Sequence, residues 1–361
     1  MLVRRQDLPG HAAGPQAKAL RVAAAPGRPK HVAPSLRDSH EGLAPSGLSA
    51  GAPILPVQDW TARRVLASGM GPSSAAHEVA SVGATLFPAD AIWEAASPLL
   101  AGFTVEVLPQ IDSTNTELMR RAKAGQLEPV LLVAERQTAG RGRLGRQWHS
   151  GAPNGNSAIK AETSGGTFSA LTFSLGLPLA PQNWSGLSLA VGVSVAQSLH
   201  PGLRLKWPND IWLQDRKLGG ILIETGSFGD VRYVVIGIGI NIAPRDATGL
   251  STPPAWLGEV QPAMDAGQAL QRIAAPLVRA VQMFEAQGFA PFQARFNALD
   301  VLAGRAVVCS DGTTGEARGA DATGALLVQT ASGLRKITSA EVSVRPAAVD
   351  GLATAPAPRP C

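Results

Sequence analysis

The sequence predicts an α+β fold, and three observations support that prediction. Strand-like segments with apolar or alternating residues are interspersed with amphipathic helical segments. Most strand-like segments follow one another closely, as in hairpins, which favours α+β over a strictly alternating arrangement of strands and helices. The chain of 361 residues is 45% hydrophobic and 16% charged, a composition that can bury a sizeable core.

The first ordered segments are a strand and a helix. Residues 103–108 alternate apolar and polar side chains, which predicts a strand. Thr114 and Glu117 fit a capping box, so a helix is expected to start there and to stop at Gly125. A helix N-terminus with spare hydroxyl and amide groups can also hold a polar ligand, so residues 113–115 have both interpretations.

The rest of the chain predicts more strands, two long helices and a small C-terminal unit. Strands are expected at residues 130–134, 170–175, 203–206, 211–213, 219–224 and 233–241. Helices are expected at residues 187–199 and 268–287. Beyond them, five short strands are expected at residues 307–310, 315–319, 325–329, 335–338 and 342–345. Turns rich in Gly and Asp separate these strands, a pattern that predicts a small β-barrel.

Composition divides the chain into five parts. Residues 1–60 are dense in Ala, Pro and Gly and are expected to be disordered. A basic arm for nucleic acid and a targeting extension are the alternatives for that segment. Residues 61–100 predict a short helical lead-in, residues 101–298 the main α+β domain, residues 299–347 the barrel and residues 348–361 a disordered tail.

Charge and cysteine content exclude several classes of protein. Residues 1–50 contain seven Lys or Arg and three Asp or Glu, and so carry +4 of the formal net charge of +5. The remainder is nearly neutral, which gives little support for a general duplex-binding surface. Cys309 and Cys361 form no disulfide framework or metal cluster. No apolar run is long enough for a membrane span, and no secretory signal is recognisable, so a cytoplasmic protein is expected.

The loop at residues 137–148 is the strongest candidate for an anion site. It sets three glycines among three arginines, so backbone N–H groups can approach a ligand while guanidinium groups bind carboxylate or phosphate oxygens. Its spacing also fits the dinucleotide-binding fingerprint. That fingerprint requires a following helix, and residues 146–155 are too rich in Gly, Pro and Asn to form one.

Two further clusters follow it. Pro208 cannot donate to a sheet ladder, so the chain must leave regular pairing there, and Asn209 and Asp210 become available to a ligand or metal. A plain hairpin turn is the structural alternative, just as Lys217 alone would be a solvated hairpin lysine. In residues 237–241 the glycines of an apolar strand permit close approach of a ligand.

In chain order these motifs read Ser-Thr-Asn, Gln with the Gly/Arg loop, Lys-Trp-Pro-Asn-Asp, Asp-Arg-Lys-Leu-Gly-Gly and Gly-Ile-Gly-Ile-Asn. In this combination the chain resembles the biotin–protein ligases from about residue 105 to residue 346. The resemblance implies a catalytic domain like that of class II aminoacyl-tRNA synthetases, with a mixed, mainly antiparallel sheet, plus a C-terminal SH3-like β-barrel. It also implies a monofunctional enzyme, biotin--[acetyl-CoA-carboxylase] ligase. Such an enzyme uses Mg²⁺ and ATP to form biotinyl-5'-AMP and then acylates a lysine of the biotin carboxyl carrier protein.

The resemblance also assigns roles to individual residues. Biotin would be held by Ser113, Thr114, Asn115, Gln137, Arg141, Gly142, Arg143 and Lys217. ATP and the adenylate would be held by Arg143, Arg146, Trp148, Asn209, Asp210 and Asn241, with Trp256 covering the adenylate. Arg141, Arg143, Lys217 and Asp210 would be catalytic, Asp210 as a base toward the acceptor lysine. No dedicated metal site is expected, because Mg²⁺ would arrive with ATP and lie near Asp210.

The chain departs from the family pattern at two places. Leu144 stands where the family usually carries a basic residue, and residues 151–167 look like an insertion, either a solvated loop or a lid. Lipoate or octanoate ligases and transferases, which resemble the same core, are the nearest alternative. A biotin-responsive DNA-binding regulator is another, although no recognition helix is readable and no specific DNA binding is expected. The sequence does not decide between a monomer and a homodimer.

Overall fold

The computed structural model describes residues 20–22, 87–150, 168–245, 253–338 and 344–346. The expectations of disorder near both ends, and the choice between loop and lid for residues 151–167, therefore concern residues that lie mainly or wholly outside the description. Within residues 1–60, where disorder was expected, residues 20–22 form a short strand instead. This strand pairs with the edge of the main sheet, where unpaired backbone groups offer a template for an extended segment.

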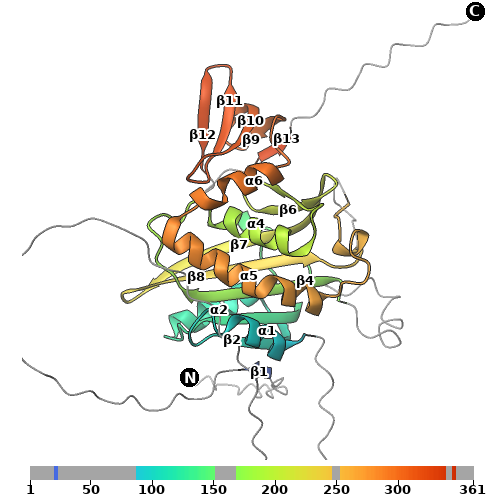
Figure 1. Ribbon diagram of the computed structural model, residues 1–361, viewed down its shortest axis with the longest axis vertical. Coiled ribbons are helices and arrows are strands. Elements are labelled where there is room, and N and C mark those ends of the chain that lie inside the picture. The colour runs from blue at the N-terminus through green and yellow to red at the C-terminus, as the bar shows by residue number, and fades with distance from the viewer. Residues whose placement is uncertain (1–19, 23–86, 151–167, 246–252, 339–343, 347–361) are drawn as a thin grey trace, which may run out of the picture. The chain divides into compact units, whose positions relative to one another are not determined.

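The main sheet has eight strands in the order β1-β2-β3-β4-β8-β7-β6-β5 (Figure 1). Among the described strands, β2 and β3 are parallel and every other neighbouring pair is antiparallel. This mixed arrangement confirms the expected α+β class. The strands are β1 (Leu20–Val22), β2 (Thr104–Ile111), β3 (Val130–Gln137), β4 (Ala170–Pro178), β5 (Arg204–Lys206), β6 (Asp210–Leu213), β7 (Arg216–Phe228) and β8 (Val231–Asn241).

Helices cover both faces of this sheet because alternate strand residues point to opposite sides. On one face Leu131 and Val133 of β3 join the large core formed with α1 (Ala89–Ala96), α4 (Leu187–Leu199) and α5 (Ala266–Gln287). On the other face Leu132 packs with Leu118 of α2 (Thr114–Lys123). The apolar face of α5 is buried against this core, with Leu270, Ile273, Leu277, Val281 and Phe284 all nearly inaccessible to solvent.

The C-terminal strands form an antiparallel sheet in the order β12-β11-β10-β9-β13. Its edge strands are not paired with each other in the described part of the chain, so the sheet is open and the expectation of a closed barrel is not confirmed. Trp207 is fully buried, and its Nε1 donates to the Gly324 carbonyl at 3.1 Å, which ties this sheet to the main domain. The elements are α6 (Gln293–Leu299), β9 (Ala306–Cys309), β10 (Thr314–Ala320), β11 (Leu326–Thr330), β12 (Gly333–Ile337) and β13 (Val344–Pro346).

Candidate active site

A cavity of about 570 Å³ lies over the middle of the main sheet. Its walls come from the start of α2, the loop after β3, strands β4, β7 and β8, and the turn between β5 and β6. All the site residues expected from the sequence line it, except Asn241 and the more weakly assigned Trp256. Segments far apart in sequence therefore form one pocket.

The polar floor depends on the parallel pairing of β2 and β3. Ile111 lies opposite Gln137 in this register, so the start of α2 lies beside the end of β3. Gln137 Oε1 accepts hydrogen bonds from the Thr114 backbone N–H at 2.8 Å and from its hydroxyl at 3.1 Å. Ser174 Oγ of β4 lies 2.7 Å from Thr114 Oγ1 and equally close to Asn115 Oδ1. These side chains are buried, and the bonds among them fix their orientation.

Asn115 and Trp148 fill space that Gly237 and Gly239 of β8 leave open. A Cβ atom on Gly237 would come within 2.0 Å of Asn115 Oδ1, and one on Gly239 within 2.5 Å of the Trp148 indole. The sequence suggested that these glycines admit a ligand. In the structure both glycines line the cavity, and each makes room for one of the protein's own cavity-lining side chains.

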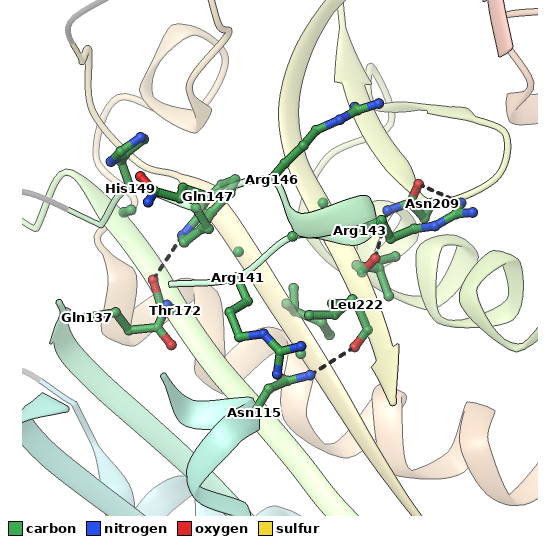
Figure 2. A pocket seen from close by; sticks show the side chains of 18 of the residues that line it. Asn115, Gln137, Arg141, Arg143, Arg146, Gln147, His149, Thr172, Asn209 and Leu222 are labelled. Carbon is green, nitrogen blue, oxygen red and sulfur yellow. Dashed lines mark hydrogen bonds between the residues drawn. The ribbon is translucent and has the colours of Figure 1, made fainter. Parts of the chain in front are cut away.

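The Gly/Arg loop folds back on itself as a short hairpin (Figure 2). Gly142 N–H donates to the Arg146 carbonyl at 2.8 Å and Trp148 N–H to the Gly140 carbonyl at 2.9 Å. Leu144 occupies the left-handed region with a φ of 56° and is 60% exposed. The side chain at this position therefore projects mainly toward solvent, although it contributes to the cavity rim.

The arginines of this loop point to different parts of the cavity. Arg141 forms an ion pair of 3.0 Å with Glu224. Arg143 Nη1 donates to Asn209 Oδ1 at 3.3 Å (Figure 2). Burial lowers the pKa of the Arg143 guanidinium from its ordinary value; the charge of Asp210 opposes this shift and that of Arg146 adds to it. A partly desolvated guanidinium gains more from an incoming anion than one in water does.

The turn between β5 and β6 supplies the opposite wall. Two hydrogen bonds to Ile221 fix Asn209. Asn209 Nδ2 donates to the Ile221 backbone carbonyl at 2.8 Å, and the Asn209 backbone carbonyl accepts from the Ile221 N–H at 2.9 Å. Asp210 Oδ1 accepts from Lys217 Nζ at 2.7 Å. The expected turn is thus present, and its polar residues face the cavity rather than only closing a hairpin.

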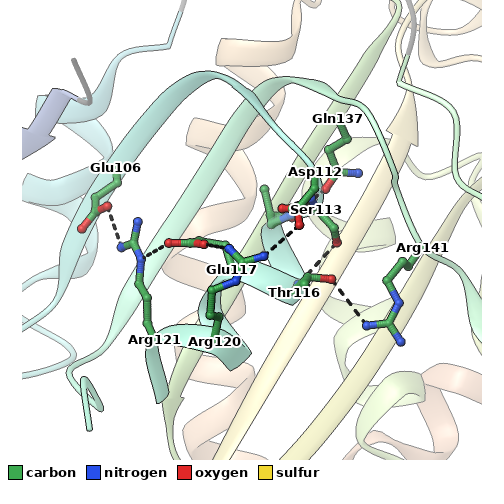
Figure 3. Close-up of polar contacts among 10 residues, drawn as sticks. Glu106, Asp112, Ser113, Thr116, Glu117, Arg120, Arg121, Gln137 and Arg141 are labelled. Carbon is green, nitrogen blue, oxygen red and sulfur yellow. Dashed lines mark hydrogen bonds and ion pairs between the residues drawn. The ribbon is translucent and has the colours of Figure 1, made fainter. Parts of the chain in front are cut away.

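The helix cap differs from its expectation by one residue. Ser113, not Thr114, is the N-cap of α2, and its side chain accepts from the Thr116 N–H. Thr114 Oγ1 bonds to Gln137 and Ser174 instead, so it is not available as a cap. Glu117 lies among arginines on the helix surface and forms an ion pair of 2.8 Å with Arg121 (Figure 3).

Four site residues were missed by sequence reasoning: Thr172, Ser174, Glu224 and Arg245. Thr172 Oγ1 accepts from the Trp148 indole N–H at 3.4 Å. The Arg245 guanidinium lies 5.3 Å from the Trp148 ring, and burial lowers its pKa from the ordinary value. Polar residues within the apolar run of β4 were an available signal for Thr172 and Ser174, because an apolar strand tolerates buried hydroxyls only with partners.

Asn241 and Trp256 are not among the residues that line the cavity. Asn241 is buried and donates to the Ala255 carbonyl at 2.8 Å, which secures the segment after β8. The centre of the Trp256 ring lies 5.9 Å from Arg216 Cζ. The expectation that they contact the nucleotide directly stays a prediction.

Neither a clustered metal site nor a membrane-spanning helix occurs in the described ranges. No group of three or more His, Cys, Asp or Glu side chains there could hold a metal ion. No helix within those ranges is long and apolar enough to cross a membrane. Asp210 is the one carboxylate among the cavity-lining residues of the described chain.

Family models match both parts of the chain. Residues 107–241 match the biotin/lipoate A/B protein ligase family, and residues 307–345 match the biotin protein ligase C-terminal domain. The first match spans the walls of the cavity from β2 to β8. The fold and the site therefore define a protein ligase of the biotin/lipoate class.

Individual relatives narrow the class. The chain is 38% identical to the bifunctional ligase/repressor BirA of Escherichia coli, over 69% of this chain and 76% of that protein. It is 33% identical to the biotin--[acetyl-CoA-carboxylase] ligase of Paracoccus denitrificans, over 65% of this chain and 98% of that protein. The biotin protein ligase of Aquifex aeolicus in complex with biotin and ATP superposes with a TM-score of 0.55 at 29% identity, covering 67% of this chain and 98% of that one. The chain belongs to the biotin protein ligase family.

Proposed function

We propose that this protein joins biotin to ATP and then transfers the biotinyl group to a lysine of the biotin carboxyl carrier protein of acetyl-CoA carboxylase and related enzymes. The observation that carries the proposal is a single cavity with a neutral polar floor at one end and Arg143, Asp210 and Lys217 at the other. The floor suits an uncharged polar head group, and the charged end suits a carboxylate and phosphates.

The first half-reaction needs charge stabilisation rather than a protein nucleophile. A biotin carboxylate oxygen attacks the α-phosphorus of ATP, the bond from that phosphorus to the bridging oxygen breaks, and pyrophosphate leaves. Negative charge on the phosphate oxygens would be stabilised by Arg141, Arg143 and Lys217, which line the cavity. Lys217 would also bring together the carboxylate and phosphate groups, which otherwise repel each other.

The two ends of the cavity suggest how the substrates lie. The biotin end comprises Ser113, Thr114, Asn115, Gln137 and Gly142. The nucleotide end comprises Arg146, Trp148, Asn209 and Asp210. A single cavity carboxylate fits Mg²⁺, which keeps several waters and binds chiefly through substrate phosphates. When bound, that ion would neutralise phosphate charge beside Asp210, without a dedicated protein cage.

The second half-reaction requires a deprotonated lysine. The acceptor amine attacks the acyl carbon of biotinyl-5'-AMP, the bond from carbon to the phosphate oxygen breaks, and AMP leaves while the amine loses a proton. Asp210 is our candidate for the proton acceptor, because it faces the cavity beside Lys217. Arg141 and Arg143 would hold the adenylate until the carrier arrives.

A pyrophosphate-release assay tests this function. The purified chain is incubated with Mg²⁺, ATP and biotin, with lipoate and octanoate in parallel, and a carrier domain is then added. We expect pyrophosphate to be released when biotin is the acid, but not with lipoate or octanoate. After the carrier domain is added, we expect its lysine to be biotinylated. Turnover with lipoate or octanoate instead would favour the related acyl-ligase class. Absence of pyrophosphate with all three acids would reject both ligase functions.

A further inference from the structure

Glu224 of β7 connects the cavity floor to the Gly/Arg loop. One carboxylate oxygen accepts from Asn115 Nδ2 at 2.9 Å, and the other lies 3.0 Å from Arg141 Nη1. We propose that Glu224 is a positioning residue that makes the cavity floor accept hydrogen bonds from a ligand N–H, and so selects biotin over acids without such a group. This inference rests on the proposed function and extends it to substrate selection.

Glu224 determines which way the Asn115 amide faces. An ionised carboxylate can only accept hydrogen bonds, so the amide nitrogen must point toward it. The Leu222 carbonyl, 3.4 Å from the same nitrogen, favours the same orientation. The carbonyl oxygen of Asn115 is therefore turned toward Ser174, 2.7 Å away.

The row of polar side chains on the floor then has fewer hydroxyl hydrogens than oxygen–oxygen contacts. Gln137 Oε1 is fixed as an acceptor by the Thr114 backbone N–H, and Asn115 Oδ1 is fixed as an acceptor by Glu224. Between these two oxygens lie the hydroxyls of Thr114 and Ser174, which form contacts of 3.1, 2.7 and 2.7 Å along the row. Two hydroxyl hydrogens serve three contacts, so one contact has no hydrogen of its own, and an oxygen there can accept from a ligand N–H.

A reversed Asn115 amide would weaken this property. Its nitrogen would donate to Ser174, so every contact in the row would have its own hydrogen and the row would have one lone pair fewer for a ligand donor. The ureido ring of biotin carries N–H donors, whereas the hydrocarbon chain of octanoate and the disulfide ring of lipoate carry none. Leaving buried polar groups without partners is a strong basis for rejecting the wrong ligand.

The ion pair with Arg141 adds a second connection. The Arg141 side chain is 52% exposed and that of Glu224 is 22% exposed, so the pair contributes little to stability. It can nevertheless orient the loop, since Arg141 also lies 3.5 Å from Thr116 Oγ1 at the start of α2 (Figure 3). Glu224 thus holds the loop at the end of the cavity where the floor residues lie.

The test compares Glu224→Gln with wild type by steady-state pyrophosphate release and by calorimetric binding of biotin without ATP. In the variant the amide oxygen of residue 224 pairs with Arg141, which can only donate, so the amide nitrogen faces Asn115 and Asn115 reverses to present Oδ1. We expect the KM for biotin to rise about tenfold or more, the scale of a lost hydrogen bond to a charged group, with the KM for ATP within about threefold. Glu316→Gln is the matched control, because Glu316 forms an exposed ion pair with Arg318 at 3.2 Å in the C-terminal sheet.

A second substitution makes the test specific to hydrogen-bond polarity. Adding Asn115→Asp to Glu224→Gln restores an acceptor facing Ser174 while residue 224 donates, so partial recovery of biotin affinity is expected. An unchanged KM for biotin in Glu224→Gln, an equal rise for biotin and ATP, or no recovery in the double variant would overturn the inference. Failure of the proposed function is a separate outcome, recognised by the absence of pyrophosphate from wild type with biotin.

Discussion

The Trp148 indole lies directly against Gly239, so close that a Cβ atom on the glycine would stand 2.5 Å from the ring. Two residues away on β8, Gly237 bears the same relation to Asn115. We propose that Trp148 contacts the nucleotide and Asn115 contacts biotin, so substitutions at the two glycines should affect different substrates.

We predict that Gly239→Ala displaces the indole and raises the KM for ATP at least about tenfold, because overpacking of 1–3 kcal/mol forces a side chain to move. Gly237→Ala should raise the KM for biotin instead. Both constants come from the same pyrophosphate-release assay, with circular dichroism to confirm folding. Equal effects of both substitutions on both substrates would contradict this division of the cavity.

Arg143 should matter most before the adenylate forms. Arg143→Ala removes a partly desolvated cation from the charged end, and loss of one such stabilising group costs roughly 10²–10³ in rate. The rate of pyrophosphate release should fall by that factor, whereas transfer from a saturating concentration of preformed biotinyl-5'-AMP should fall much less. Arg272→Ala, on the exposed surface of α5, is the control and should behave as wild type.

Asp210 should matter most in the transfer step. Asp210→Asn keeps the side-chain shape but cannot accept a proton from the lysine, and general base catalysis typically contributes 10²–10⁴ in rate. Single-turnover transfer from preformed biotinyl-5'-AMP to a carrier domain measures this step alone. Asp230→Asn, an exposed residue after β7, serves as control. Wild-type transfer by Asp210→Asn would eliminate the base role.

Asp300 should make stability depend on pH. Burial raises the pKa of its carboxyl from 3.8 to about 6, against the Leu302 N–H and the charge of Arg305, which lower it. One carboxyl oxygen accepts from that N–H at 2.9 Å, and the other is buried without a partner. The folded chain holds this proton more tightly than the unfolded chain does. The protonated carboxyl therefore favours the folded state fully below about pH 4, and this contribution to stability is lost as the pH rises through about 6.

Replacing Asp300 by Asn should therefore stabilise the protein at neutral pH. The expected gain is about 1–3 kcal/mol at pH 8, since each unit of pKa difference corresponds to about 1.4 kcal/mol, and it should be clearly smaller at pH 5. Urea unfolding at both pH values measures the difference. The same gain at both would show that the carboxyl does not titrate in this range.

Local patterns in the sequence predicted most elements, because hydrophobic periodicity and turn residues act over short distances. The helix at residues 187–199 was expected with the bounds of α4, and the five C-terminal strands were expected near their observed places. Strand ends were less predictable: β3 continues to Gln137 and β7 runs from Arg216 to Phe228, because pairing with neighbouring strands extends them.

The missed site residues depend on pairing between distant segments. Glu224 reaches Asn115 across 109 sequence positions, and nothing near Glu224 in the sequence indicates that contact. Ser174 joins the floor because β4 lies beside β3 in the sheet. Asn241 ends a glycine-rich strand as expected, yet its side chain turns to the Ala255 carbonyl. Such outcomes follow from strand order, which motif spacing does not encode.

The strand order also couples substrate binding to the completion of folding. Strands β4 and β8 lie between β3 and β7, so Gln137 and Lys217 face a common cavity only after both intervening strands have paired. A partly folded chain without β8 would have the Gly/Arg loop but no assembled pocket. Substrates that bind only the finished sheet would then stabilise the whole sheet, by about 2.7 kcal/mol at a concentration one hundred times the Kd. Substrate supply and the survival of the folded chain would thereby be linked by mass action.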